Sequence, residues 1–390
     1  RCMVTIAVDA ASSFIRDLGS PCTAISLRDG SIIAGSKEGS LICWLASTGK
    51  EVWRVSVEGP ISDIATSHDR VFVTASSSLY AIDDSDGSIF WKRELEGASD
   101  YVLSVEGSIW ATSSVYEIEV GDYTESSIWR FNRSGELVKR WVIPERCWFI
   151  GPSFGKIILG LGRPRCGILS IDGDDLVHFE IGDGNPIVCG DYTTQDGGSA
   201  ISILGHSSGA VSWVEGHTEE VKDQNRIGSP WRAPIIEESS AACCILVPGI
   251  GSEFITAYEN GFIKSNYGWS YDAQSAVSAM AVGPSGDGET KRTYWACAGW
   301  RVLVLSSPDT AGDVDNSEAP GGQLILELKH ECRLVEPNSE GDTIVLGDER
   351  GRIYSINGQF LRRRIEEGGV GINSDKRISV MRERLRKLRE

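Results

Sequence analysis

Two adjacent cysteines, Cys243 and Cys244, have the spacing that most directly suggests chemistry, because neighbouring thiols can be oxidised to a disulfide. They lie within the apolar run 241–247, which has the pattern of an inner β-strand. Successive strand residues point to opposite faces of a sheet, whereas a disulfide between neighbours needs a distorted turn. We therefore expect both residues to be thiols in a core strand.

Two acidic stretches, residues 83–87 and 172–175, resemble calcium loops only in composition. A helix–loop–helix calcium site needs oxygen ligands at alternate positions and a bidentate glutamate at the twelfth, and neither stretch supplies that set. Aspartate and glycine are also the residues that tight turns require. We interpret both stretches as turns.

The five histidines lie at positions 68, 178, 206, 217 and 330 and share no metal-ligand spacing. None stands in a local nucleophile motif with serine and aspartate. The sequence leaves open whether some of these histidines lie close together in space, because a closed fold can bring distant loops together. We expect no catalytic, cofactor-binding or metal-binding residue and no cofactor, and hence a protein that is not an enzyme.

The C-terminal tail, residues 366–390, carries the best candidates for binding. Residues 361–390 hold ten Arg or Lys and five Asp or Glu, a charge of +5, which leaves −22 for the rest of a chain whose total is −17. Ser374 and Asp375 can cap a helix, and apolar residues then follow at steps of three and four. The residues predicted to bind a partner are Arg377, Ile378, Met381, Arg384, Leu385 and Leu388. Their surface is either the acidic body of this chain or a groove on a partner protein, with a nucleic acid or an anionic membrane as weaker alternatives.

The charge and apolar content of the chain limit the classes of partner that it can bind. The net charge of −17 and the pI near 4.9 oppose direct binding of nucleic acid by the body of the chain, since such binding depends on Lys and Arg. The sequence contains no run of about 18 apolar residues, so it predicts no membrane-spanning helix. The ten cysteines lack the spacing of a disulfide framework, so we expect reduced thiols and a cytoplasmic location.

A sequence pattern typical of β-hairpins recurs along the chain and predicts the elements that position the candidate residues. In residues 31–44 an apolar run ends in glycine, a polar turn follows, and a second glycine opens another apolar run. The pattern recurs in residues 201–213, 254–263 and 343–354. A second turn with glycine then leads to an edge strand, where Trp53, Trp91 and Trp141 occupy one repeat position; we expect these tryptophans to pack between repeats.

Each repeat is predicted to form a four-stranded antiparallel sheet, and such sheets bury both faces by stacking around an axis. The fold class is all-β, a β-propeller of eight blades with a short C-terminal helix; the alternative is seven blades. We expect residues 1–365 to form one domain, with residues 4–9 or 14–16 joining the last blade to close the ring, and no helix before residue 374. The predicted blade segments are 20–59, 60–97, 98–144, 145–184, 185–229, 230–274, 275–332 and 333–365.

The residues 79–92, an apolar–Tyr–Ala–Ile–Asp run followed by glycine and then tryptophan, resemble the PQQ-like repeat of quinoprotein-type propellers. The resemblance is strongest over residues 20–97 and stays in phase to about residue 360. It is WD-like in architecture only, because no Trp-Asp pair closes a blade. This family includes quinone-dependent dehydrogenases, a bacterial outer-membrane assembly lipoprotein and many cofactor-free scaffolds, and we interpret the chain as a scaffold member.

We therefore predict a non-catalytic protein-interaction scaffold, a subunit or recruiter in a larger intracellular complex. One alternative implied by the resemblance is a quinoprotein-like enzyme or small-ligand sensor with a site in the central channel, in which a disulfide between adjacent cysteines packs on the quinone. The other is an extracytoplasmic assembly-type lipoprotein. Three long loops, residues 116–126, 283–292 and 306–322, are further candidates for binding, because loops on a rigid scaffold carry function.

Overall fold

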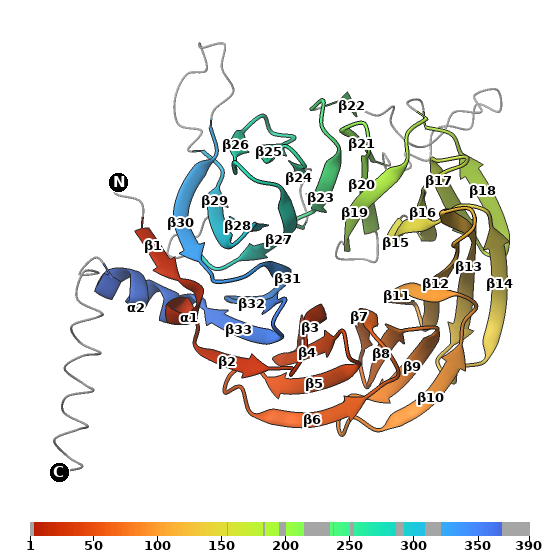
Figure 1. Cartoon of the computed structure of the whole chain (residues 1–390), viewed down its shortest axis with the longest axis horizontal. Coiled ribbons are helices and arrows are strands. Elements are labelled where there is room, and N and C mark those ends of the chain that lie inside the picture. The colour runs from red at the N-terminus through yellow and green to blue at the C-terminus, as the bar shows by residue number, and fades with distance from the viewer. Residues whose placement is uncertain are drawn as a thin grey trace.

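The computed structural model describes residues 4–153, 155–181, 184–194, 200–213, 235–236, 238–249, 253–285, 292–308 and 321–368. These residues form eight β-sheets arranged around a central axis (Figure 1). The predicted eight-bladed propeller is confirmed, with one short C-terminal helix. None of the helices in this part of the chain has the length and apolar character needed to cross a bilayer.

The first four blades follow one another along the chain. Blade 1 contains β3 (Cys22–Arg28), β4 (Ser31–Ser36), β5 (Ser40–Leu45) and β6 (Glu51–Ser56); blade 2 contains β7 (Ile61–Ser67), β8 (Arg70–Ala75), β9 (Ser78–Asp83) and β10 (Ile89–Glu94). Blade 3 contains β11 (Ala98–Val105), β12 (Ser108–Glu117), β13 (Asp122–Asn132) and β14 (Leu137–Ile143); blade 4 contains β15 (Cys147–Ser153), β16 (Lys156–Leu161), β17 (Ile168–Asp172) and β18 (Asp175–Phe179).

The last four blades continue the same order. Blade 5 contains β19 (Ile187–Thr194), β20 (Ala200–His206), β21 (Ala210–Trp213) and β22 (Ile235–Ile236); blade 6 contains β23 (Ala242–Leu246), β24 (Ile255–Tyr258), β25 (Phe262–Ser265) and β26 (Ser270–Asp272). Blade 7 contains β27 (Val277–Gly283), β28 (Thr293–Ala298), β29 (Arg301–Ser306) and β30 (Gln323–Lys329), and blade 8 contains β31 (Leu334–Glu340), β32 (Thr343–Asp348) and β33 (Arg352–Asn357).

The N-terminal segment completes the last two blades. Strand β2 (Phe14–Asp17) pairs antiparallel with β33 and supplies the outer strand that blade 8 lacks. Strand β1 (Val4–Ala7) pairs parallel with β30 as a fifth strand of blade 7. The N-terminal strand β2 thus joins the last blade to the start of the chain. Because β2 fills the empty outer position of a three-stranded blade, the count is eight rather than seven.

Burial explains the strand pattern. In β4 and β5 the residues are buried on both faces, because each middle strand lies between two neighbouring blades. In the outer strand β6 only Trp53 is buried, so the strand alternates between the blade interface and solvent. The two middle strands of a blade are therefore apolar on both faces, whereas the outer strand carries both apolar and polar residues.

The tryptophans of the outer strands pack between blades, as predicted. The Trp91 indole N–H donates to the Arg133 carbonyl in the next blade at 3.0 Å. A Cβ atom on Gly135 would lie 2.7 Å from the Trp91 ring, and Gly135 has a φ of +80°, so this turn needs glycine on two grounds. Trp53 makes the same contacts with Asp84 and Gly87. The recurring Gly and Trp are thus two halves of one joint between successive blades.

The innermost strands share an irregularity near their first residues. In all eight blades the register between the first and second strands shifts at this point. At three of these bulges the side chain donates to a backbone carbonyl at the start of the innermost strand of the next blade: Ser62 to Ser99, Cys243 to Val277 and Ser278 to Leu334. Bulges increase local twist and re-aim side chains, and here they join neighbouring blades around the axis.

The two helices correct one expectation. The absence of helix before residue 374 is wrong: α1 (Val8–Ala11) joins β1 to β2, and α2 (Gly358–Gly368) follows β33. Leu361 of α2 is buried in the same apolar cluster as Val8 and Ala11. Gly358 has the pattern of the turn before an outer strand, but β2 already occupies that position, so the chain leaves the sheet as a helix. The helix predicted after Ser374 lies outside the described residues.

Candidate functional site

The six tail residues predicted to bind a partner, Arg377, Ile378, Met381, Arg384, Leu385 and Leu388, also lie outside the described residues. Their role stays a prediction. The other candidates can be placed in the ring.

Cys243 and Cys244 lie in β23, as predicted, and both are free thiols. The Cys243 thiol donates to the carbonyls of Ala257 and Val277 at 3.3 and 3.1 Å. Burial raises the pKa of Cys243 to about 11 and that of Cys244 well above its usual value. Neither residue forms the disulfide that the quinoprotein alternative implies, and at neutral pH neither is a thiolate nucleophile.

The acidic turns behave as turns. The Asp83 carboxylate accepts hydrogen bonds from the backbone N–H and hydroxyl of Ser85, and it forms an ion pair with Arg70 at 2.6 Å. Asp86 accepts from the backbone N–H of Ser88 at 2.9 Å. The carboxylate oxygens of Asp83 and Asp86 therefore accept hydrogen bonds from the turn between β9 and β10 and stabilise it.

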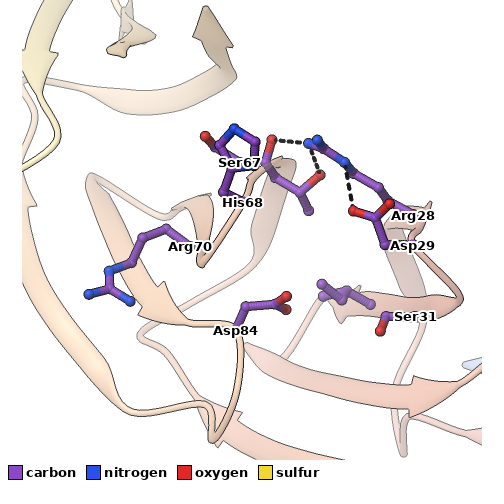
Figure 2. A pocket seen from close by; sticks show the side chains of 9 residues that line it. Arg28, Asp29, Ser31, Ser67, His68, Arg70 and Asp84 are labelled. Carbon is purple, nitrogen blue, oxygen red and sulfur yellow. Dashed lines mark hydrogen bonds and ion pairs between the residues drawn. The ribbon is translucent and has the colours of Figure 1, made fainter.

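A hollow between blades 1 and 2 is lined by Arg28, Asp29, His68, Arg70 and Asp84, among others (Figure 2). The Arg28 guanidinium is 3.2 Å from Asp29 and donates to the Thr66 carbonyl at 2.9 Å. Arg70 is held by Asp83. Both cations are already paired within the protein, so the hollow has little affinity left for an anion.

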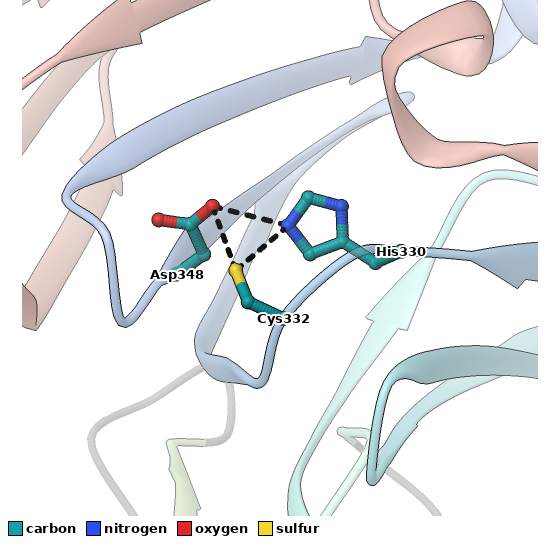
Figure 3. A group of neighbouring side chains, drawn as sticks. All are labelled: His330, Cys332 and Asp348. Atoms are coloured by element: carbon teal, nitrogen blue, oxygen red, sulfur yellow. Dashed lines mark hydrogen bonds and ion pairs between the residues drawn. The ribbon is translucent and has the colours of Figure 1, made fainter.

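The closed ring does bring one set of chemically capable residues together. His330, Cys332 and Asp348 meet beside blade 8, from the link between β30 and β31 and from the end of β32 (Figure 3). The Nε2 atom of His330 is 3.0 Å from Asp348 Oδ2 and 3.4 Å from Cys332 Sγ. Sequence reasoning missed this cluster because only its His330–Cys332 half is local; Asp348 follows 16 residues later.

The cluster is not a nucleophilic triad. In such a triad the histidine contacts the nucleophile through one ring nitrogen and the carboxylate through the other. Here Cys332 and Asp348 share the same nitrogen, Nε2. Burial, with the hydrogen bond to Asp348, raises the pKa of Cys332 to about 11, so the sulfur stays protonated at neutral pH.

Two aspartates on the innermost strands were also missed. Asp63 of β7 accepts the backbone N–H of Val102 in blade 3 at 2.9 Å, and Asp191 of β19 accepts that of Val247 in blade 6 at 2.7 Å. Burial raises the pKa of Asp63 to about 6 and that of Asp191 to about 7. Each carboxyl joins its blade to the next, and the only sequence signal is a lone acidic residue in an apolar inner strand.

Replacing Asp191 with Asn is expected to make the protein more stable at pH 8. The native pKa lies above the unfolded value, so the native state binds more protons and the contribution to unfolding free energy is lost as pH rises through about 7. Asn keeps an oxygen for the Val247 N–H but has no charge to bury. Urea unfolding at pH 5 and pH 8 should show wild type losing about 1–3 kcal/mol more than D191N across this range.

The matched control for D191N is Asp172→Asn, since Asp172 is an exposed carboxylate paired with Lys156 at 3.0 Å. D172N should keep the wild-type pH dependence. Equal pH slopes for wild type and D191N would show that Asp191 does not bury a charge at neutral pH.

The most exposed apolar group in the described ring is the tip of the β12–β13 hairpin. These strands have 10 and 11 residues, whereas the corresponding β4 and β5 have six each, so the hairpin projects beyond its blade. At the acidic-apolar tip, residues 116–122, Tyr116, Ile118 and Val120 are 52%, 89% and 62% exposed. The exposed acidic residues Glu117, Glu119 and Asp122 alternate with them. Clustered exposed apolar groups with a polar rim mark interaction sites.

The base of this hairpin is rigidly held. The guanidinium of Arg146, in the link from blade 3 to blade 4, lies 4.0 Å from the centre of the Tyr123 ring and 4.2 Å from that of Trp148. Arg146 also pairs with Asp100 of β11 at 2.9 Å, and Asp100 accepts a hydrogen bond from Ser114 of β12. The tip turn is closed by the Gly121 N–H, which donates to the Glu117 carbonyl at 2.8 Å. The long loop predicted at residues 116–126 is therefore an ordered hairpin with a presented apolar end.

Comparisons with known proteins agree with this architecture. A family model described as the outer membrane protein assembly factor BamB matches residues 12–122. No curated protein matches the chain. Among solved structures, the computationally designed Ika8 protein is similar at a TM-score of 0.65 and 11% identity, covering 91% of this chain and 99% of that one.

Two natural structures are similar as well. Sqt1 of Saccharomyces cerevisiae has a TM-score of 0.61 and 10% identity, with 89% of this chain and 98% of that chain covered. BamB of Moraxella catarrhalis has a TM-score of 0.60 and 14% identity, with 88% and 97% covered. The family match and these folds confirm a PQQ-like, WD-like β-propeller. This fold is compatible with a protein-interaction scaffold.

Proposed function

We propose that this propeller is a non-catalytic scaffold, a subunit or recruiter in a larger complex, that binds a partner protein with its acidic-apolar tip. The observation that carries the proposal is the exposure of Ile118 and Val120 on an ordered, projecting hairpin. The blades of the ring can be formed without such a projection. Leaving large apolar side chains in water is unfavourable, and a partner that covers them recovers that free energy.

The partner's chemistry follows from the rim of the tip. Glu117, Glu119 and Asp122 surround the apolar side chains, so the complementary surface is an apolar patch bordered by Lys or Arg. The Arg146 contacts at the hairpin base keep the apolar end in place before binding. Less conformational freedom is then lost on association.

A non-catalytic role is supported by the chemistry of the described clusters. The Cys243–Cys244 pair is present as half-buried thiols, and the His330 cluster lacks the arrangement of a triad. The name of the matching family, an assembly factor, also fits work with protein partners. We propose a cytoplasmic location, which is supported by nine described cysteines that are thiols rather than disulfides, most of them buried.

Replacing Ile118 and Val120 together with Ser is expected to reduce partner binding at least tenfold. The side chains are exposed, so folding stability should change by less than about 0.5 kcal/mol. The measurement compares complexes cross-linked in native cells by wild type and by the double variant, with urea unfolding of each purified protein.

The control for this experiment is Trp300→Ala, which removes a 68% exposed aromatic side chain from a different blade. It should leave the cross-linked complexes unchanged. Glu117→Lys with Glu119→Lys should weaken the same complexes and remove part of their salt dependence. Complexes that survive the I118S and V120S changes intact would exclude the tip as the binding element.

A further inference from the structure

We propose that His330, Cys332 and Asp348 form a binding site for one divalent transition-metal ion of the zinc type (Figure 3). Each residue offers one ligand atom, and the three atom types are those that zinc binds in proteins. Tyr354 places its hydroxyl beside them as a fourth donor. The proposal is independent of the scaffold function and of the hairpin tip.

The distances among the donor atoms suit a tetrahedral ion. The Nε2–Oδ2 separation is 3.0 Å, and the sulfur lies 3.4 Å from each of these atoms. The Tyr354 hydroxyl is 3.0 Å from Asp348 Oδ2 and 3.3 Å from His330 Nε2. With zinc bonds of about 2.0–2.3 Å, the edges of a tetrahedron are about 3.3–3.7 Å. A small outward movement of the four donors therefore makes room for the ion.

The hydrogen-bonding groups of the cluster cannot all be satisfied at once in either neutral tautomer of His330. Asp348 Oδ1 already accepts the backbone N–H groups of Arg350 and Arg352 at 2.9 and 2.8 Å. The other oxygen, Oδ2, faces Nε2 of His330, the hydroxyl of Tyr354 and the thiol of Cys332. With the proton on Nε2 all three groups are donors, and a carboxylate oxygen with two lone pairs cannot accept well from all of them. With the proton on Nδ1, two acceptors, Nε2 and Oδ2, face each other at 3.0 Å. A metal ion resolves this, because it replaces the proton of Cys332 and binds Nε2 directly.

The groups around the donors are also arranged as a metal site requires. The two backbone N–H groups orient the Asp348 carboxylate. The second nitrogen of His330, Nδ1, is 4.0 Å from a carboxylate oxygen of Asp9 in α1, which is beyond hydrogen-bond distance. Carboxylates that accept a hydrogen bond from this nitrogen set the ring orientation of metal-bound histidines. A thiolate and a carboxylate would neutralise the two charges of the ion, which matters because Cys332 and Asp348 are buried.

The position of the site gives the ion a structural effect. Asp348 belongs to blade 8, His330 and Cys332 to the link from blade 7, and Asp9 to the N-terminal helix α1. A metal ion bound by His330, Cys332 and Asp348 would hold the link from blade 7 to blade 8 where the ring closes, close to α1. An ion that binds only the native state raises the free energy of unfolding with the logarithm of the free metal concentration, once that concentration exceeds Kd.

The test uses the full-length protein purified without a metal-binding tag, stripped with chelator and titrated with Zn²⁺ or Co²⁺ alone. We expect one ion per chain, a higher melting temperature with Zn²⁺, and the thiolate-to-cobalt absorption band with Co²⁺. Cys332→Ser should abolish that band and weaken binding at least tenfold. Cys243→Ser, at a thiol that only donates to backbone carbonyls, should behave as wild type.

If folded wild-type protein takes up no stoichiometric metal and shows no thiolate band, the cluster is a hydrogen-bonded joint and the proposal is wrong. The same holds if C332S and wild type bind Co²⁺ equally. If the stripped protein is unfolded and Zn²⁺ restores its structure, the proposal is supported, and C332S should then resist restoration. None of these outcomes depends on whether the hairpin tip binds a partner.

Discussion

Deleting residues 1–17 is expected to destroy the cooperative folding of this protein. The deletion removes β2, whose residues Phe14 to Asp17 pair with Ser355 to Arg352, and leaves β33 as an unpaired edge. It also removes Val8 and Ala11 from the apolar cluster around Tyr354. The loss should exceed about 5 kcal/mol, which is comparable with the whole stability of a typical domain. Circular dichroism and urea unfolding would measure it, and size-exclusion chromatography would show association through the exposed edge.

The control is a deletion of residues 1–7, which removes only β1. That strand is an extra fifth strand on blade 7, whose four antiparallel strands remain. The shorter deletion should lower stability moderately and keep a single unfolding transition. If the longer deletion unfolded at the wild-type urea concentration, closure of the ring by the N-terminal strand would not contribute to stability.

Replacing Trp91 with Ala is expected to cost about 3–5 kcal/mol. The ring is buried between blades 2 and 3, with its centre 5.9 Å from that of Phe72 and 6.3 Å from that of Phe131. Its removal leaves a cavity over Gly135 and an unpaired carbonyl on Arg133. Urea unfolding of the variant should give a lower midpoint with a similar slope.

Trp300→Ala is the matched control, because it truncates the same residue type at a site that is 68% exposed. Its stability should stay within about 0.5 kcal/mol of wild type. Trp91→Phe should lie between the two, since it keeps apolar contact but loses the hydrogen bond to Arg133. Equal midpoints for W91A and W300A would mean that the contacts between blades are not what stabilises the ring.

Much of this architecture is encoded locally. Alternating apolar runs and positive-φ glycines specify each hairpin within about a dozen residues, and a four-stranded sheet with two apolar faces must stack on others. The recurrence of Trp53, Trp91 and Trp141 at one repeat position therefore predicted their packing between blades. For the same reason the strand period alone placed Cys243 and Cys244 in a core strand without a disulfide.

Other features depend on residues that are distant in the chain. Phe14 pairs with Ser355, and Asp9 approaches His330, only because the ring closes with eight blades. The helix α2 has no local signal, since it depends on which strand fills the outer place of blade 8. The meeting of His330 with Asp348 depends on how the link into blade 8 lies beside the end of β32. Sequence by itself determined the repeating unit, because its hydrogen bonds and apolar periods are short-ranged. Tertiary structure decided how the ring closes, because closure depends on contacts across more than 300 residues. It also decided which side chains meet beside blade 8, because His330 and Asp348 come from different elements of the chain.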